Sequence, residues 1–531
     1  MNQTIEIYDT TLRDGTQAEN FNLSVDDKIK ITQQLDDLGV DFIEGGWPGS
    51  NPLSVEYFLR MRRINLQRAS LAAFGSTRHF RNTAERDTNL QALLDSGAPV
   101  LTIFGKSWDI HVTDSLRIEL DDNLALIEES LAYLRPNVDR LIYDAEHFFD
   151  GFKHNRDYCL STLVAAISGG ADTLVLCDTN GGTLPHEIGP VVRQVQELLS
   201  EKGAAVTLGI HTHNDTENAV ANALLAVELG VQHVQGTING FGERCGNANL
   251  TSILPALVFK MHRTCKAGPQ IEHLYSTSRL INELANLPNN RYQPYVGESA
   301  FAHKGGIHVS AVQRNPVTYE HIQPEKVGNV RRVVVSDQAG RSNILHKARK
   351  YGIQLEADDP MMSSIISELK HLENQGYQYE AAEASFELLM RRALGLQRRF
   401  FTLAAFRVMN HKYDIDKDPF TEATIRITVG GREVHTAAMG DGPINALDKA
   451  MRAALTQFYP ILEEMELADY KVRVLTGEHG TGAKVRVLIE SKDATDAWST
   501  VGVSFNIIEA SWQALVDSFN FKLLKEEKAR S

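Results

Sequence analysis

Short apolar runs rich in β-branched residues recur eight times in the first half of the chain, and each ends in polar or glycine residues. Such runs are typical of buried parallel strands. The segments between them have helical spacing. In 24–39, for example, Ser24 is a suitable N-cap and Gly39 stands where a helix ends. The predicted strands cover residues 5–9, 41–45, 70–75, 100–105, 140–147, 173–179, 206–213 and 233–240.

Eight strands that alternate with helices predict an α/β fold, a (β/α)₈ TIM barrel over residues 1–270. A doubly wound open sheet is the structural alternative, and the count of eight favours closure. In a barrel the functional residues lie at the carboxyl ends of the strands and in the loops that follow.

The pattern changes after the barrel. Residues 271–400 have helical periodicity and predict helical linker subdomains. In residues 401–531, strands followed by a helix occur twice, which indicates an internal repeat and a C-terminal α+β domain. Its first two strands lie in 423–440 and are joined by a VGGR turn.

Composition excludes several classes of protein. The formal net charge of −14 argues against a general affinity for nucleic acid. No apolar stretch is long enough to span a membrane, and the N-terminal residues have no secretory signal pattern. The four cysteines show no CxxC spacing, so we expect no disulfide framework and a cytoplasmic protein.

Chemically capable side chains gather at the predicted strand ends. All strand ends meet water, which explains some polar residues there but not this density of charged residues and histidines. The most informative are Arg13 and Asp14 after the first strand, Glu146 at the fifth, Thr179 at the sixth, His211 and His213 at the seventh, and Asn247 after the eighth.

His211 and His213 are two residues apart on a strand, so their side chains point the same way. In a closed barrel the seventh strand neighbours the eighth, and the eighth neighbours the first. Asp14 and Asn247 can therefore approach both imidazoles. Such nitrogen and oxygen ligands suit Mg²⁺, Mn²⁺ or Zn²⁺ without choosing among them. A metal here can polarise the carbonyl of a 2-oxo acid. Arg13 can stabilise an enolate or alkoxide nearby, and a structural salt bridge is its alternative role.

Several long motifs closely resemble the family of 2-isopropylmalate, homocitrate and citramalate synthases. They are DTTLRDGTQ (9–17), LCDTNGGTLP (176–185), GIHTHNDTENAVANALLAVELG (209–230) and NGFGERCGNANL (239–250). Further segments look most like the citramalate branch, among them EGGWPGSNP (44–52), FGKSWDIHV (104–112), DAEHFFDGFK (144–153) and FAHKGGIHVSAV (301–312). The resemblance covers essentially the whole chain.

The resemblance implies a catalytic barrel, a linker region and a C-terminal regulatory domain in a homodimer. It implies acetyl-CoA as co-substrate, which loses a methyl proton and attacks the ketone of an acceptor before the thioester is hydrolysed. The citramalate branch implies pyruvate as acceptor, (R)-citramalate as product, a place in isoleucine biosynthesis and isoleucine as effector. A dimerisation domain without a ligand is the alternative for residues 401–531.

The resemblance also implies roles for the residues at the strand ends. It implies that the metal ligands are Asp14, His211 and His213, with Asn247 close by. It implies that Arg13 stabilises the reacting oxygen. It also implies that Thr179 holds the carboxylate of the acceptor and that Glu146 belongs to the acceptor site. Around Glu146, AEHFFDG departs from the sequence of the leucine-branch enzymes.

Two further residues lie outside the predicted barrel. His308 matches a histidine of the proton-abstraction machinery, and histidine is a common base near neutral pH. A surface histidine in a glycine-rich loop is its alternative. Tyr319 matches a family tyrosine, although NPVTYEHI differs from the short-spaced versions. His308 must reach the site from the linker region of its own or the partner subunit.

Three rival functions remain open from the residues alone. A 2-isopropylmalate or homocitrate synthase would take a longer acceptor, which Phe104 and Tyr143 are expected to exclude by filling the pocket. A lyase would cleave a 3-hydroxy-3-methylglutaryl-type thioester, but the long C-terminal part of the chain argues against it. The third rival is a non-catalytic amino-acid-sensing protein. The presence of Arg13, Asp14 and both histidines argues against it, because a sensor does not need them.

Overall fold

The computed structural model describes residues 4–285, 287–334, 341–356, 359–379, 382–416, 418–475 and 482–530. They form two compact units. The first comprises Met1–Phe301 and His321–Arg331, and the second comprises Ala302–Glu320 and Arg332–Ser531. The predicted boundaries at residues 270 and 400 stay a prediction.

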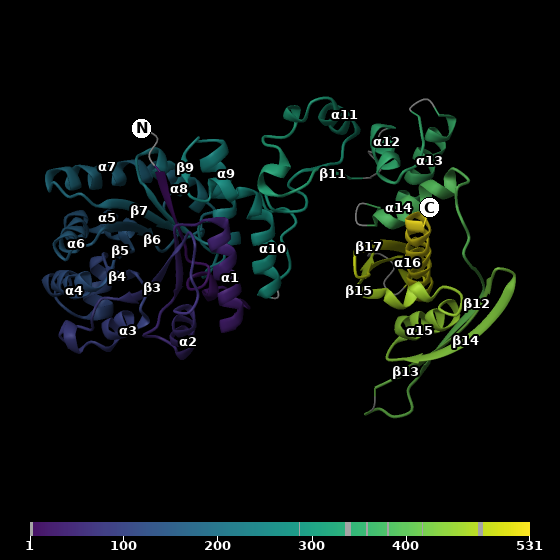
Figure 1. Ribbon diagram of the computed structural model, residues 1–531, viewed down its shortest axis with the longest axis horizontal. Coiled ribbons are helices and arrows are strands. Elements are labelled where there is room, and N and C mark those ends of the chain that lie inside the picture. Colours follow the sequence, from purple (N-terminus) through teal and green to yellow (C-terminus); the bar gives the residue numbers. More distant parts are fainter. Residues whose placement is uncertain are drawn as a thin grey trace. The chain divides into compact units, whose positions relative to one another are not determined.

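The first unit is a closed barrel of parallel strands with helices around it (Figure 1). The strand order is β2-β3-β4-β5-β6-β7-β8-β1, and β1 pairs with β2 to close the ring. This confirms the predicted (β/α)₈ barrel. The strands are β1 (Thr4–Asp9), β2 (Phe42–Gly46), β3 (Ser70–Ser76), β4 (Val100–Lys106), β5 (Arg140–Glu146), β6 (Thr173–Asp178), β7 (Thr207–Thr212) and β8 (His233–Gly236), with a short β9 (Thr264–Cys265) beside β1.

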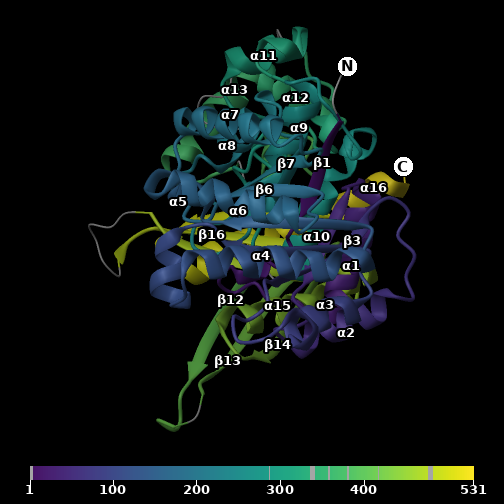
Figure 2. The ribbon, with the colours of Figure 1, turned by 90° about the vertical axis from the view of Figure 1, so that its left-hand side faces the viewer.

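Helices cover the outside of the barrel, and α4 and α6 lie on the side that faces the viewer in Figure 2. Ser24 and Asp27 form a capping box at the start of the first helix, and Gly39 ends it at φ 86°, as the sequence predicts. The helices are α1 (Val25–Leu38), α2 (Pro52–Met61), α3 (Thr88–Ser96), α4 (Leu120–Leu134), α5 (Phe148–His154), α6 (Arg156–Ser168), α7 (Pro185–Glu201), α8 (Ala219–Glu228), α9 (Leu250–Phe259) and α10 (Leu274–Leu284).

Successive residues of a barrel strand enter two different cores. Tyr8, Val100 and Ile142 belong to a cluster that fills the interior of the barrel. Their neighbours Ile7 and Leu101 belong to the large core between strands and helices. The barrel is therefore packed solid below the level of the strand ends, as in other barrels of this type.

One predicted boundary is wrong. The eighth strand ends at Gly236 and not at residue 240. Residues Ile238–Gly240 form a 3₁₀ turn in which Asn239 takes the left-handed conformation at φ 64°. A left-handed residue cannot continue a strand, so the chain turns away early.

The second unit begins with helices. A parallel pair of short strands, β10 (Ala302–His303) and β11 (Arg332–Val333), frames the first of them. Residues 362–394 belong to the stretch with helical periodicity, and the structure divides them between two helices at Gly376, whose φ is 108°. The helices are α11 (Gly306–Arg314), α12 (Arg341–Lys350), α13 (Pro360–Asn374) and α14 (Glu383–Ala393).

The rest of this unit confirms the internal repeat, because three antiparallel strands and a helix occur twice. Gly430 and Gly431, both at positive φ, form the predicted turn. The first strand of the first repeat was not predicted. The repeats are β12 (Thr402–His411), β13 (Phe420–Val429), β14 (Arg432–Gly440) and α15 (Pro443–Leu455), then β15 (Glu466–Val474), β16 (Val485–Lys492), β17 (Ala497–Ser504) and α16 (Ile507–Arg530).

No helix in the described part of the chain has both the length and the apolar character needed to cross a membrane.

Candidate active site

Four predicted ligand positions meet at one end of the barrel, because β7, β8 and β1 are neighbours there. Asp14 lies in the turn after β1, His211 lies in β7, and His213 directly follows β7. A backbone bridge pairs His213 with Asn247, which follows β8. Residues far apart in the sequence thus share the carboxyl end of three adjacent strands.

The two imidazoles and the carboxylate point at one small space. Oδ2 of Asp14 lies 3.3 Å from Nε2 of His211 and 3.8 Å from Nε2 of His213. The two Nε2 atoms are 3.3 Å apart. Ligand atoms about 2.1 Å from one ion in a tetrahedral arrangement lie about 3.4 Å from one another. All three side chains are buried, and the group is suited to hold a divalent metal.

Unpaired atoms at the same place support this conclusion. Within the described residues, Oδ1 of Asp14 and Oδ1 of Asn247 are buried and accept no hydrogen bond. Buried polar atoms are normally hydrogen-bonded. A cation satisfies both oxygens, so the residues present fit a metal ion.

The charges of the group also suit a metal. Burial pushes the pKa of Asp14 up, but Arg13 and the two histidines outweigh burial and hold that pKa below its ordinary value. Burial, together with the neighbouring His211, lowers the pKa of His213 to about 3. Asp14 is therefore an anion and His213 is neutral, which are the states in which these side chains bind metals.

A buried amide fixes the orientation of His211. Oε1 of Gln235 lies 2.8 Å from Nδ1 of His211, and the amide nitrogen of Gln235 donates to Asp144 at 3.0 Å. Because the oxygen of Gln235 accepts from Nδ1 of His211, Nε2 of His211 is the ring nitrogen that faces Asp14 and the metal space. No pattern in the sequence points to this role of Gln235.

Replacing Gln235 with methionine is expected to weaken metal binding by about 10–100-fold, the usual effect of losing such a supporting hydrogen bond. Calorimetric titration of the chelator-treated protein with Mn²⁺ measures it. Gln196→Met is the matched control, because the amide of Gln196 donates to the backbone oxygen of Leu229 on the helical layer. Wild-type Mn²⁺ affinity in the Gln235 variant would contradict the role assigned to this amide.

Arg13 is held rigidly beside the metal space. Its Nε donates to Glu44 at 2.6 Å, its guanidinium lies 3.7 Å from the centre of the Phe74 ring, and its NH1 lies 3.5 Å from Asp14. Glu44 is fully buried and also accepts a hydrogen bond from the hydroxyl of Tyr8 at 2.7 Å. Glu44 therefore positions Arg13, a role that the sequence pattern does not reveal.

Thr179 follows β6 and faces the amide of His147. The backbone N–H of His147 donates to Oγ1 of Thr179 at 2.9 Å, and His147 has the left-handed conformation at φ 55°. The hydroxyl of Thr179 accepts this bond, so its own proton is left to donate to another group, such as a carboxylate.

Glu146 ends β5, and its carboxylate bonds the ammonium of Lys106 at the end of β4. Glu146 and Thr179 thus lie on neighbouring strands at the same end of the barrel as the metal group. Their roles toward an acceptor stay predictions.

The expectation for Tyr143 is wrong, and the expectation that Phe104 limits the size of the acceptor stays a prediction. The ring of Phe104 stacks on Phe74 with centroids 5.4 Å apart and meets the edge of Trp47. These rings form an aromatic wall beside Arg13. Tyr143 is fully buried in the core between strands and helices, with its hydroxyl near Ser107. It cannot line a pocket at the mouth of the barrel.

His308 and Tyr319 belong to the second unit. Their rings stack with centroids 4.3 Å apart and an interplanar angle of 29°. The structure thus brings these two predicted residues together with one another, and their part in the reaction stays a prediction.

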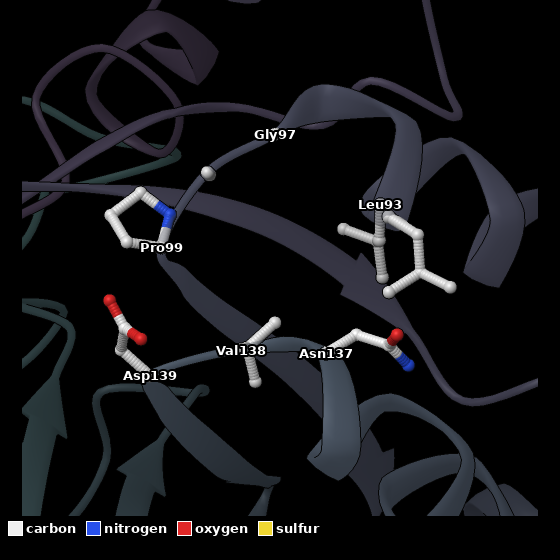
Figure 3. A pocket seen from close by; sticks show the side chains of 8 residues that line it. Leu93, Gly97, Pro99, Asn137, Val138 and Asp139 are labelled. Atoms are coloured by element: carbon white, nitrogen blue, oxygen red, sulfur yellow. The ribbon is translucent and has the colours of Figure 1, made fainter.

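A separate cavity of about 390 Å³, shown in Figure 3, is lined by residues that precede the strands and so lies at the opposite end of the barrel. Pro99 and Asp139, which directly precede β4 and β5, line it together with Leu93 and Asn137. In barrels of this type the amino ends of the strands contribute stability and the carboxyl ends contribute chemistry. This cavity is therefore no part of the candidate active site.

Three family models match the chain in succession: HMGL-like over residues 4–281, homocitrate synthase post-HMGL domain-like over 295–377, and LeuA allosteric (dimerisation) domain over 380–523. The chain is 56% identical over 524 residues to an (R)-citramalate synthase of Geobacter sulfurreducens, covering 99% of this chain and 98% of that one. It is 51% identical to an (R)-citramalate synthase of Aquifex aeolicus, covering 99% of each. A probable 2-isopropylmalate synthase of Methanopyrus kandleri is 31% identical over 98% of each. With this similarity along almost its whole length, the chain belongs to the 2-isopropylmalate, homocitrate and citramalate synthase family, in its (R)-citramalate synthase branch.

Proposed function

We propose that this protein condenses acetyl-CoA with pyruvate and water to give (R)-citramalate and CoA. The identity of 56% to a full-length relative of that name carries the proposal, and the buried group of Asp14, His211 and His213 supports it with a metal site of the right chemistry. The reaction is a Claisen-type condensation, so the enzyme is an acyltransferase in which the acyl group becomes an alkyl group.

The barrel residues act on the acceptor. When bound by Asp14, His211, His213 and Asn247, a divalent ion (Mg²⁺, Mn²⁺ or Zn²⁺) supplies a Lewis acid for the keto oxygen of pyruvate. Arg13 stabilises the negative charge that develops on that oxygen. Thr179 donates its hydroxyl proton to the carboxylate of pyruvate, and Glu146 completes the acceptor site.

His308 acts on acetyl-CoA. It belongs to the machinery that removes a proton from the methyl group, and Tyr319 supports it. The resulting enolate carbon bonds to C2 of pyruvate, and the keto oxygen takes up a proton. Water then cleaves the thioester, which releases citramalate and free CoA.

The C-terminal domain is proposed to regulate and dimerise the enzyme, with isoleucine as the effector of an isoleucine-producing pathway. The family model over residues 380–523 is an allosteric and dimerisation domain, which supports this role. The four free cysteines fit a cytoplasmic enzyme. Inhibition of CoA release by isoleucine, but not by leucine at the same concentration, tests the effector.

The decisive experiment measures the release of free CoA from acetyl-CoA with a panel of 2-oxo acids, with and without chelator. We expect preference for pyruvate over 2-oxoisovalerate and 2-oxoglutarate, and loss of activity on chelation that added metal restores. Equal turnover of pyruvate and 2-oxoisovalerate would refute the acceptor. No detectable release of CoA with any of the 2-oxo acids would favour a non-catalytic sensor.

Replacing Phe104 with alanine is expected to shift this preference toward larger acceptors, because it opens the aromatic wall. The ratio of kcat/KM for pyruvate to that for 2-oxoisovalerate should fall by about tenfold or more. Discrimination of this size is usual when a pocket separates substrates that differ by one or a few carbon atoms. Tyr143→Phe is the matched control, since Tyr143 faces the helices and its ratio should stay that of the wild type. An unchanged ratio in the Phe104 variant argues that the wall does not select the acceptor.

A further inference from the structure

The segment 302–320 of the second unit folds back so that its two ends meet. It leaves β10, forms α11, turns at Asn315 and ends at Glu320. Nε2 of His303 lies 3.0 Å from Oε1 of Glu320. The side chains are separated by 17 positions, yet both are more than nine-tenths buried. This bond joins the beginning of the segment to its end.

Backbone hydrogen bonds tie the beginning of the segment to the residue after β11 and hold its end in a local turn. The oxygen of His303 accepts from the N–H of Val334 at 2.9 Å, next to the pairing of β10 with β11. The N–H of Glu320 donates to the oxygen of Pro316 at 2.9 Å. The side-chain bond connects the beginning of the segment, which is tied to the strand pair, to the turn at its end, and a bond to a carboxylate is strong where water is excluded.

The middle of the segment carries His308 and Tyr319, whose rings are stacked. Neither ring is enclosed within its own unit, because His308 is exposed and Tyr319 is 47% exposed. Burial in that unit therefore does not fix the stack. Tyr319 directly precedes Glu320 in the sequence, so a displacement of Glu320 displaces Tyr319 as well.

We propose that His303 and Glu320 are positioning residues whose hydrogen bond closes the segment 302–320 and holds His308 and Tyr319 in their stacked arrangement for the reaction. This inference rests on the proposed function, in which His308 helps to remove the methyl proton of acetyl-CoA. His303 and Glu320 act through these two rings.

The test begins with Glu320→Ala, which removes the acceptor of the bond. We expect kcat for CoA release to fall by about tenfold, because small misplacements of reacting groups have effects of this size or larger. The KM for pyruvate should stay that of the wild type, since the barrel holds pyruvate. Glu320→Gln keeps an oxygen that accepts from His303 and should restore most of kcat.

Two readouts separate positioning from a general loss of structure. In a His308→Asn background, Glu320→Ala should lower kcat no further, because the ring that it positions is already gone. The ¹³C-labelled ring signal of His308, assigned from its loss in His308→Asn, should move in Glu320→Ala toward an unstacked position and return in Glu320→Gln. Glu383→Ala is the matched control: it breaks the ion pairs of Glu383 with Lys347 and Lys350 in the same unit and should leave the His308 signal in place.

The outcomes also distinguish the inference from the function on which it rests. If His308→Asn lowers kcat but Glu320→Ala keeps the wild-type kcat and the wild-type His308 signal, the positioning role is wrong and the proposed function stands. If His308→Asn itself keeps the wild-type kcat, the role of His308 in the proposed function is wrong. Equal further losses from Glu320→Ala with and without His308 would identify a merely structural bond.

Discussion

Replacing Asp14 with asparagine is expected to lower kcat/KM for citramalate formation by about 10³-fold or more, because a Lewis acid contributes several kcal/mol to such a transition state. The carboxylate lies within 4 Å of both imidazole Nε2 atoms, and the amide that replaces it is neutral. Without that charge, two neutral imidazoles and an amide oxygen bind a divalent ion weakly.

Two measurements check this expectation: the initial rate of CoA release at saturating metal, and the metal content of the purified protein by mass spectrometry. Asp87→Asn is the matched control, since Asp87 is a buried aspartate of the same unit that caps α3 and asparagine is an equally good cap. It should keep both activity and metal. An Asp14→Asn enzyme with full metal content and wild-type kcat would remove Asp14 from the site.

Replacing Arg13 with lysine is expected to lower kcat by about 10²–10³-fold, the range for losing one donor to a developing oxyanion. Lysine keeps the charge but not the fork of donors, so it cannot bond Glu44 through Nε, stack on Phe74 and face the metal space together. The KM for pyruvate should change much less, because Arg13 acts mainly on charge that appears during the reaction.

The same substitution also leaves the buried Glu44 with one fewer donor, so folding must be measured beside activity. Thermal unfolding and circular dichroism establish the folded fraction, and kcat is expressed per folded protein. Glu44→Gln in a parallel variant keeps shape and weakens the bond to Arg13, and it should give a smaller loss of the same kind. A wild-type kcat in folded Arg13→Lys would assign Arg13 to the structural salt bridge alone.

The sequence predicts the barrel and the metal group well because both depend on simple periodicities. Eight apolar runs separated by helices favour a closed barrel over an open sheet, and the spacing of His211 and His213 places both side chains on one face. Closure then makes β7, β8 and β1 neighbours, which is sufficient to bring Asp14 and Asn247 to the same end.

Other features depend on side-chain positions that periodicity does not contain. The bonds from Gln235 to His211 and from Glu44 to Arg13 join different strands, and their partners depend on the register of neighbouring strands. The strand β12 was missed because most of its residues are exposed on both faces, so no alternation marks it.

The mistake about Tyr143 was avoidable from the sequence. Glu146 was assigned to the site, and Tyr143 is three positions from it on the same strand, so the two side chains lie on opposite faces of the strand. Tyr143 therefore belongs on the face of the strand that is turned to the helices, and the structure places it there.

The packed interior of the barrel has a kinetic consequence. Tyr8, Val100 and Ile142 fill the space beneath the metal group. The described part of the barrel is therefore open to solvent at one end only and is not a channel. Substrates arriving and products departing share that end.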